Sequence, residues 1–250
     1  MAVLAVAPFG SSRPRAAEAI ARDAAVASAQ ALGTGRAVIT PPDGSLPRGD
    51  EVTYTFAGDD LSVEGSGTGP NGTPFTFGRR MVDGEHYFIW NPGGSGEGEW
   101  LHDIAAAPVA AGDFIFDPRG LLDLLAPAAG FELAGEGTID GSDVTQLHAT
   151  TPEAVDASGL RLGEAAAGPG TLTALDVWVD RDDVVRRIDL TLRVDFRDAV
   201  IIGPWSGPQP IVDMPPQRSS VRFTDIGAPL TVEAPATSRD VDPRVPPPPA

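Results

Sequence analysis

Long runs in which every second residue is apolar constrain this sequence more than any other feature. In "EVTYTFAG" (residues 51–58) and "RIDLTLRVDF" (residues 187–196) apolar and polar side chains alternate, which predicts β-strands with one buried face and one face in water. Tight-turn signals separate such runs at Asp83-Gly84, at Asp140-Gly141 and at the "DRDD" of residues 180–183. Strands joined in this way form an antiparallel meander, and a long meander curls as it twists.

Two segments have a helical period instead. The first, residues 14–32, is rich in alanine and ends before two glycines, which predicts an amphipathic helix with a face of small residues. That face is expected to comprise Ala16, Ile20, Ala24, Ala27 and Ala31. The strand "RAVIT" of residues 36–40 follows it.

The second helical segment is "FDPRGLLDLLAP", residues 116–127. Asp117 is a good N-cap residue, Pro118 suits the first helical position and Pro127 ends the run. Its apolar side comprises Leu121, Leu122, Leu124 and Leu125. Because this side needs an apolar surface to cover, we expect an α+β fold, in which a strongly curved antiparallel β-sheet, an open half-barrel, has helices covering its concave face.

Composition limits the functions that remain. A chain of 250 residues with 42% hydrophobic side chains can bury a substantial core as one domain. The formal net charge of −17 would repel nucleic acid and anionic lipid surfaces, so nucleic acid is not an expected partner. The chain has no cysteine, which excludes disulfides, thiolate metal sites and a lipid-modified cysteine within it.

Motifs for catalysis, cofactors or metals are weak. The three histidines, His86, His102 and His148, have no characteristic spacing, and no G-x-S-x-G or P-loop pattern is present. The acidic turn at residues 180–183 begins like a calcium loop but has neither the required glycine nor the terminal glutamate, so a solvated turn is expected. We therefore expect no enzyme, no cofactor and no metal site.

The order of these elements resembles a known family. An N-terminal helix, a run of strands, the "DPRGLLDLL" helix, further hairpins including "LDVWVDRDDVVRRIDL", and the closing "VRFTDIGAPLTVEAPA" follow one another. This order is similar to that of the actinobacterial LppX/LprG-type lipoproteins, which share the half-barrel fold of the lipoprotein carrier LolA. The resemblance spans roughly residues 14–236, and its motifs are Trp178-Val179-Asp180 and the "DIGAP" of residues 225–229.

The resemblance implies a non-enzymatic protein of the cell envelope, outside the cytoplasm, that holds acyl chains between the sheet and the helices. Its partners would be an acyl lipid, a lipoglycan or the acyl chains of a lipoprotein. The four leucines named above would form the lid. The remaining ligand-binding residues would be Tyr54, Phe56, Phe75, Phe77, Phe88, Trp90, Val177, Val179, Ile188, Leu190 and Leu192. Without the resemblance, the same side chains read as an ordinary hydrophobic core.

The sequence departs from the family pattern in two ways. The missing cysteine means that the chain as written is not lipid-anchored, so attachment would need a segment outside it. The stretch of residues 197–220 interrupts an expected short connection between strands. Its apolar residues from Val200 to Trp205 would either contact the envelope membrane, cover the cavity mouth, or extend a strand that packs on the core.

Three segments are expected along the chain. Residues 1–13 are apolar but too short for a membrane span, and fit either the remnant of a signal or anchor, or a frayed end. Residues 14–236 would form the lipid-binding domain, and the proline-rich residues 237–250 a disordered or polyproline tail.

Two other functions remain open. The chain could be the extracytoplasmic sensor or interaction domain of a membrane-anchored regulator of the anti-sigma-factor type. It could also be a hydrolase with an unrecognised site, which the weak catalytic motifs disfavour.

Overall fold

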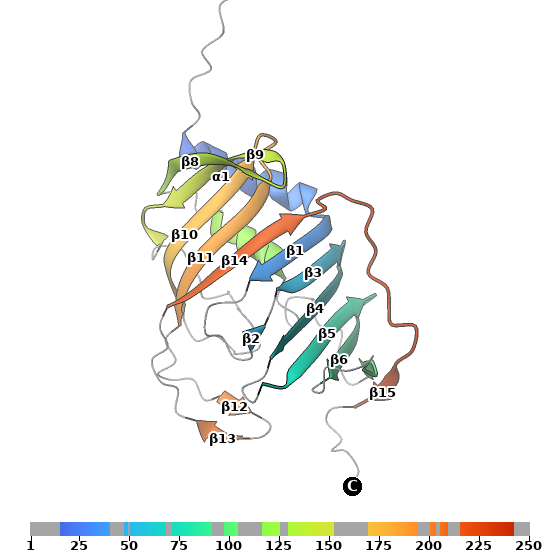
Figure 1. Cartoon of the computed structure of the whole chain (residues 1–250). Helices are drawn as coiled ribbons and strands as arrows, with labels where there is room; N and C mark the ends of the chain where they lie inside the picture. The colour runs from blue at the N-terminus through green and yellow to red at the C-terminus, as the bar shows by residue number, and fades with distance from the viewer. Residues whose placement is uncertain are drawn as a thin grey trace, which may run out of the picture.

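A computed structural model provides the fold. It describes residues 16–40, 48–49, 51–68, 72–91, 98–104, 117–125, 130–152, 170–194, 201–203, 206–209 and 216–242. Two helices lie on one side of a large sheet, behind it in the view of Figure 1. They are the α-helix α1 (Ala17–Ala31) and the 3₁₀-helix η1 (Pro118–Leu125).

The predicted curved antiparallel sheet is confirmed. Its strands are β1 (Thr34–Thr40), β2 (Arg48–Gly49), β3 (Val52–Ala57), β4 (Asp60–Thr68), β5 (Pro74–Val82), β6 (Glu85–Asn91), β7 (Leu101–Asp103), β8 (Phe131–Ile139), β9 (Ser142–Ala149), β10 (Gly170–Asp180), β11 (Val185–Val194), β14 (Gln217–Thr224) and β15 (Arg239–Val241). Their spatial order is β15-β7-β6-β5-β4-β3-β1-β14-β11-β10-β9-β8, with β2 paired beside β4. The sheet therefore consists of two meanders joined at the centre by the β1–β14 pair, and it does not close into a barrel.

The predicted turns form where their sequences require them. Asp83 and Gly84 have positive φ values of 53° and 79°, and Asp140 and Gly141 have values of 49° and 81°. Two successive residues with positive φ are typical of the tight hairpin turns whose twist matches that of the flanking strands. These turns fix the registers of β5 with β6 and of β8 with β9.

Helix α1 packs against η1, β8 and β11. Its buried face consists of Ala17, Ala21, Ala24 and Ser28. The predicted stripe is confirmed only in part: Ala24 is fully buried and Ile20 packs against the core, but Ala16 is exposed. The helix is rotated so that the Ser28 hydroxyl accepts a hydrogen bond of 2.8 Å from the backbone N–H of Val185.

The second helix forms as predicted, but with 3₁₀ geometry. Asp117 caps it through a 2.9 Å hydrogen bond that its side chain accepts from the N–H of Arg119. With three residues per turn, side chains three apart eclipse one another. The four leucines therefore form two columns, and all four are buried in the core.

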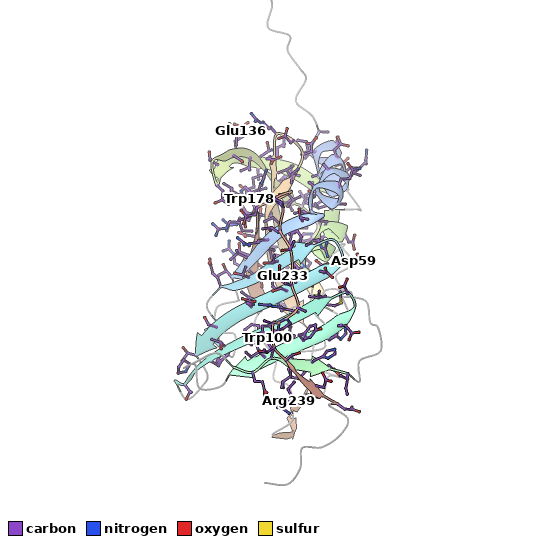
Figure 2. All side chains as sticks on the ribbon, turned by 90° about the vertical axis from the view of Figure 1, so that its right-hand side faces the viewer. Asp59, Trp100, Glu136, Trp178, Glu233 and Arg239 are labelled. Carbon is purple, nitrogen blue, oxygen red and sulfur yellow. The ribbon has the colours of Figure 1, made fainter. Side chains whose placement is uncertain are left out.

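The end of the described chain differs from the expected tail. After β14 the segment of residues 228–238, here called the strap, crosses the outer face of the sheet past Glu233, and Arg239 follows it (Figure 2). Residues 239–241, predicted to belong to a disordered tail, instead form β15 in parallel with β7. Hydrogen bonds hold this strand, including one of 2.9 Å from the N–H of Arg239 to the carbonyl of Trp100.

The inserted segment is partly described. Its strands β12 (Ile201–Gly203) and β13 (Ser206–Gln209) form a separate two-stranded sheet, drawn at the opposite end from α1 in Figure 1. The expectation that this segment extends a strand of the main sheet is therefore wrong for β12. Its backbone partner is β13 instead. Val200, Trp205 and the side chains of β12 lie outside the described structure, so the membrane contact stays a prediction.

Candidate functional site

Strand register places side chains in rows across the inner face of the sheet, which is the face that carries the helices. The row nearest the β5–β6 turn joins Phe56 of β3, Leu61 of β4, Met81 of β5 and His86 of β6. All four side chains are at most 5% exposed. We call them the closed row, because no apolar ligand can reach this part of the face without displacing protein.

The next rows are more exposed. One joins Tyr54, Val63, Arg79, Phe88 and Leu101, and its neighbour contains Val52, Gly65 and Phe77. Six half-buried side chains of these two rows form what we call the open patch: Val52, Tyr54, Phe77, Arg79, Phe88 and Leu101. This patch is the part of the inner face where a ligand could add to the protein surface.

A glycine shapes the open patch. A Cβ atom at Gly65 would lie 2.6 Å from the ring of Phe77, a separation that is too short for any side chain larger than hydrogen. The Phe77 ring therefore lies against the Gly65 backbone. Phe75 continues the surface, with its ring centroid 6.3 Å from that of Phe77 and the two planes within 26° of parallel.

The structure divides the predicted ligand-binding residues into two groups. The first group is fully buried in the main core: Phe56, Leu121, Leu122, Leu124, Leu125, Val177, Val179, Ile188 and Leu190. The second group lies in or beside the open patch: Tyr54, Phe75, Phe77 and Phe88. Trp90 and Leu192 are placed by backbone only, opposite Phe77 and Leu172.

Two polar side chains lie within the open patch. Tyr54 and Arg79 share a row and are separated by Val63. Burial raises the pKa of the Tyr54 hydroxyl to about 12, with the charge of Arg79 opposing this shift and that of Asp117 adding to it. Burial also lowers the pKa of Arg79, although an arginine remains protonated in proteins. At neutral pH the pair therefore consists of one neutral hydroxyl and one guanidinium cation.

Sequence reasoning missed Arg79. In "PFTFGRRMV" the period of two places Arg79 in phase with Phe75, Phe77 and Met81, and Arg80 on the opposite face. That phase was the available signal. The structure separates the two arginines, because Arg80 bonds Glu64 at 2.8 Å on the outer face.

The surroundings of the three histidines indicate structural roles. The ring of His102 bonds Glu85 and Asp240, each at 2.9 Å, and His148 bonds Asp176 at 3.0 Å. His86 is buried in the closed row, and burial lowers its pKa, with the charges of Asp103 and Glu85 acting in the opposite direction.

The acidic turn is solvated as predicted at Arg181 and Asp182, but not at Asp180. Asp180 is buried, and its carboxylate accepts hydrogen bonds from the N–H groups of Asp182 and Val184, at 2.9 and 3.0 Å. Arg186 pairs with the same carboxylate at 2.6 Å. Within the described ranges, no group of three or more acidic or histidine side chains is arranged to hold a metal ion.

A surface pocket of about 360 Å³ lies where η1 meets α1 and the β3–β4 turn. Leu122, Arg119 and Asp59 contribute to its lining. Arg119 is fixed there, since it donates a 2.8 Å hydrogen bond to the carbonyl of Gly58 and pairs with Asp117 at 2.6 Å. This pocket lies beside η1, and none of its lining residues belongs to the open patch.

In the part of the chain that the structure describes, no helix is both long enough and apolar enough to cross a bilayer.

Comparisons with known proteins identify the fold. No protein-family model matches the chain, and no curated protein sequence matches it. Among solved structures, LprF from Mycobacterium bovis matches with a TM-score of 0.53 and 15% identity, over 89% of this chain and 100% of that chain. The lipoprotein LppX from Mycobacterium tuberculosis matches with a TM-score of 0.45 and 13% identity, over 86% and 98% of the two chains. The chain thus has the fold of LprF, and the resemblance to LppX/LprG-type lipoproteins is confirmed at the level of the fold.

Proposed function

We propose that this protein is a non-enzymatic carrier or binding domain of the cell envelope that holds an acyl chain on the inner face of its sheet. The observation that carries the proposal is the open patch. Tyr54, Phe77 and Phe88 are large rings that remain half-buried on the same face as the main core. An acyl chain laid across them would complete the burial that the chain itself leaves incomplete.

The chemistry of the patch suits such a ligand. An acyl chain needs apolar area rather than directional partners, and each methylene that leaves water contributes about 0.8 kcal/mol. The rows next to the patch are closed and well packed, so the rings are supported on a rigid surface. The fold shared with LprF, together with the family resemblance of the sequence, supports an envelope role outside the cytoplasm.

In this proposal the core leucines of η1 form part of a lid. They seal the closed end of the inner face, and loading or release would require η1 and α1 to move away from the sheet. The fully buried predicted residues would then contribute to the ligand site only in an opened state. The half-buried rings would contact the ligand in the state described above.

Adjacent residues of β6 provide a matched test. Phe88 and Ile89 are both half-buried, but they lie on opposite faces of the same strand. We expect Phe88→Ala to weaken the binding of methyl oleate several-fold, since one ring of the patch is lost, and Ile89→Ala to leave that affinity unchanged. Displacement of a neutral fluorescent probe measures both. If the wild-type protein fails to bind methyl oleate, or if the two variants lose affinity equally, the proposed site is wrong.

A further inference from the structure

The open patch ends at a short strand near one edge of the sheet. Strand β7 has three residues and pairs with β6 at two positions, Tyr87 with His102 and Phe88 with Leu101. Because side chains alternate between the two faces of a strand, Phe88 and Leu101 belong to the open patch, and Tyr87 and His102 lie on the outer face. Two residues of the ligand surface are thus direct neighbours of two residues of the outer face.

Strand β15 holds β7 from the other side and pairs with all three of its residues. Backbone hydrogen bonds of 2.9 and 3.1 Å run from the N–H of Arg239 to the carbonyl of Trp100 and from the N–H of Ile104 to the carbonyl of Val241. The 3.0 Å ion pair of Arg239 with Glu99 joins two side chains that are each 60% exposed, and such pairs contribute little. If β15 detached, β7 would keep its two pairings with β6.

The side chain of His102 joins β6, β7 and β15 on the outer face. Its Nδ1 lies 2.9 Å from a carboxylate oxygen of Asp240 in β15, and its Nε2 lies 2.9 Å from a carboxylate oxygen of Glu85 in β6. The imidazole ring also stacks on the ring of Tyr87, with centroids 4.9 Å apart. Both ring nitrogens therefore face an acceptor.

The protonation state of His102 decides how many of these bonds can form. A carboxylate only accepts hydrogen bonds, and a neutral imidazole has one N–H donor, whereas the imidazolium ion has two. Loss of the proton therefore leaves one ring nitrogen with its lone pair directed at a carboxylate. Asp240 is the partner that can withdraw, because its strand has three residues and its side chain is 69% exposed. Glu85 belongs to β6, which is paired on both sides.

Other charged and titratable groups surround this cluster. They are Glu85 and Tyr87 of β6, Asp83 of the β5–β6 turn, Arg80 of β5, and Arg239 and Asp240 of β15. Burial and the nearby carboxylates raise the pKa of Tyr87, so its hydroxyl stays neutral below about pH 10. The arginines stay charged. The hydrogen bonds to Glu85 and to Asp240 raise the pKa of His102, which makes this ring the group that loses a proton above its ordinary value of about 6.5.

We propose that protonated His102 clamps β15 onto β7 and thereby keeps Leu101 and Phe88 in position for an acyl ligand, so that ligand affinity falls when the proton is lost. This inference rests on the proposed function and adds regulation by pH to it. The clamp is complete below about pH 6.5 and is lost as the pH rises through the raised pKa of His102. By linkage, a bound ligand must in turn favour the attached state of β15.

Methyl oleate carries no charge and therefore tests the coupling without titrating itself. Displacement of a neutral fluorescent probe measures its affinity at about pH 6 and about pH 9, on either side of the expected transition. The wild-type protein should bind about fivefold more tightly at the lower pH, the lower end of the coupling typical of two linked sites. His148→Gln, the same substitution at a histidine of β9 that bonds Asp176, should retain this pH dependence.

Two variants of the clamp should differ in a defined way. His102→Gln has one donor group and one acceptor group, like the neutral ring, and should bind weakly at both pH values. Asp240→Asn has an amide that can donate to a neutral ring, so both hydrogen bonds can form without the extra proton. Its affinity should therefore stay near the value at about pH 6 when the pH is raised. A merely destabilising change would not produce this opposite pair of results.

Three results would overturn the clamp. Equal affinity of the wild-type protein at the two pH values would refute it and leave the proposed acyl-binding function in place. A wild-type pH dependence in folded His102→Gln would do the same. If His102→Gln does not fold, as judged by circular dichroism, a wild-type pH dependence in Asp240→Asn decides against the clamp. Failure of the wild-type protein to bind methyl oleate at either pH would refute the proposed function and this inference together.

Discussion

At the level of single residues, the carboxylate of Asp180 organises the turn between β10 and β11. It accepts hydrogen bonds from two backbone N–H groups and forms an ion pair with Arg186. The Asp180 side chain is only 4% exposed. The Trp178-Val179-Asp180 motif therefore has a structural role, since its acidic residue caps a turn. The "DIGAP" motif also has a structural role. Its Asp225 has a φ of 50° and lies directly after the end of β14.

Asp180→Ala should destabilise the fold by about 2 to 4 kcal/mol, because it leaves Arg186 and two backbone donors without their acceptor. Urea unfolding measures the change. Asp182 in the same turn is exposed, and Asp182→Ala should change the free energy of unfolding by less than about 0.5 kcal/mol. Equal effects of the two substitutions would contradict the role given to Asp180.

The open patch shows how much of a site can be predicted from patterns of residues. The phase of β5 was sufficient to place Phe75 and Phe77 on one face, and by the same rule Arg79 with them. The sequence could not indicate that Tyr54 faces Arg79 across Val63, because that depends on the registers of β3, β4 and β5 with one another. It also could not separate Phe56, which is buried, from Phe88, which is half-buried, since both obey the same alternation.

At the level of elements, strands and hairpins were predictable because alternation and turn residues are local signals. The face that α1 buries was not, because alanines lie on every side of this helix and the hydrogen bond from Val185 to Ser28 fixes the rotation. The 3₁₀ geometry of η1 and the pairing of β15 depend on contacts with segments distant in the sequence. Residues 239–241 do not alternate between apolar and polar side chains in a way that would predict a strand.

β15 is attached to the sheet partly through a titratable group. Hydrogen bonds to Glu85 and Asp240 raise the pKa of His102 above its ordinary value, against a smaller effect of burial. A raised pKa in the folded state stabilises the attachment fully below the unfolded value of about 6.5, and the stabilisation is lost as the pH rises through the raised pKa. The end of the strap is therefore held most firmly in mildly acidic conditions.

Hydrogen exchange of residues 239–241 tests this attachment. At pH 6 these amides should exchange faster in His102→Gln than in the wild-type protein, and the difference should shrink as the pH rises past the raised pKa. Comparing the two proteins at equal pH removes the intrinsic pH dependence of exchange. A difference that grows with rising pH would mean that the sign of the coupling is wrong.

At the level of the whole molecule, the sheet brings the two ends of the fold together at its centre. β1 pairs with β14, so Arg36 lies opposite Thr224 and forms an ion pair of 2.9 Å with Asp225. The open edge at β8 is exposed along most of its length and carries Glu132 and Glu136. Such charges discourage pairing with other strands, which fits a sheet that curls without closing.

This architecture separates a sealed half from an open half. On one side α1 packs against β8 and β11, and Val177, Ile188 and Leu190 of β10 and β11 are buried. The rings of β3, β5 and β6 remain half-buried on the same face. Phe56 of the same face is fully buried whereas Phe77 and Phe88 are half-buried, and this asymmetry is the basis for proposing an acyl ligand.

The most direct measurement is native mass spectrometry of the purified protein, followed by organic extraction and identification of what is released. We expect an acyl lipid at one equivalent per chain, reduced in Phe88→Ala and retained in Ile89→Ala. A protein that carries no lipid and takes up none when oleic acid, methyl oleate or a phospholipid is supplied would contradict the account. The inner face would then be a core without a ligand, and an interaction or sensor domain would be the better interpretation of the fold.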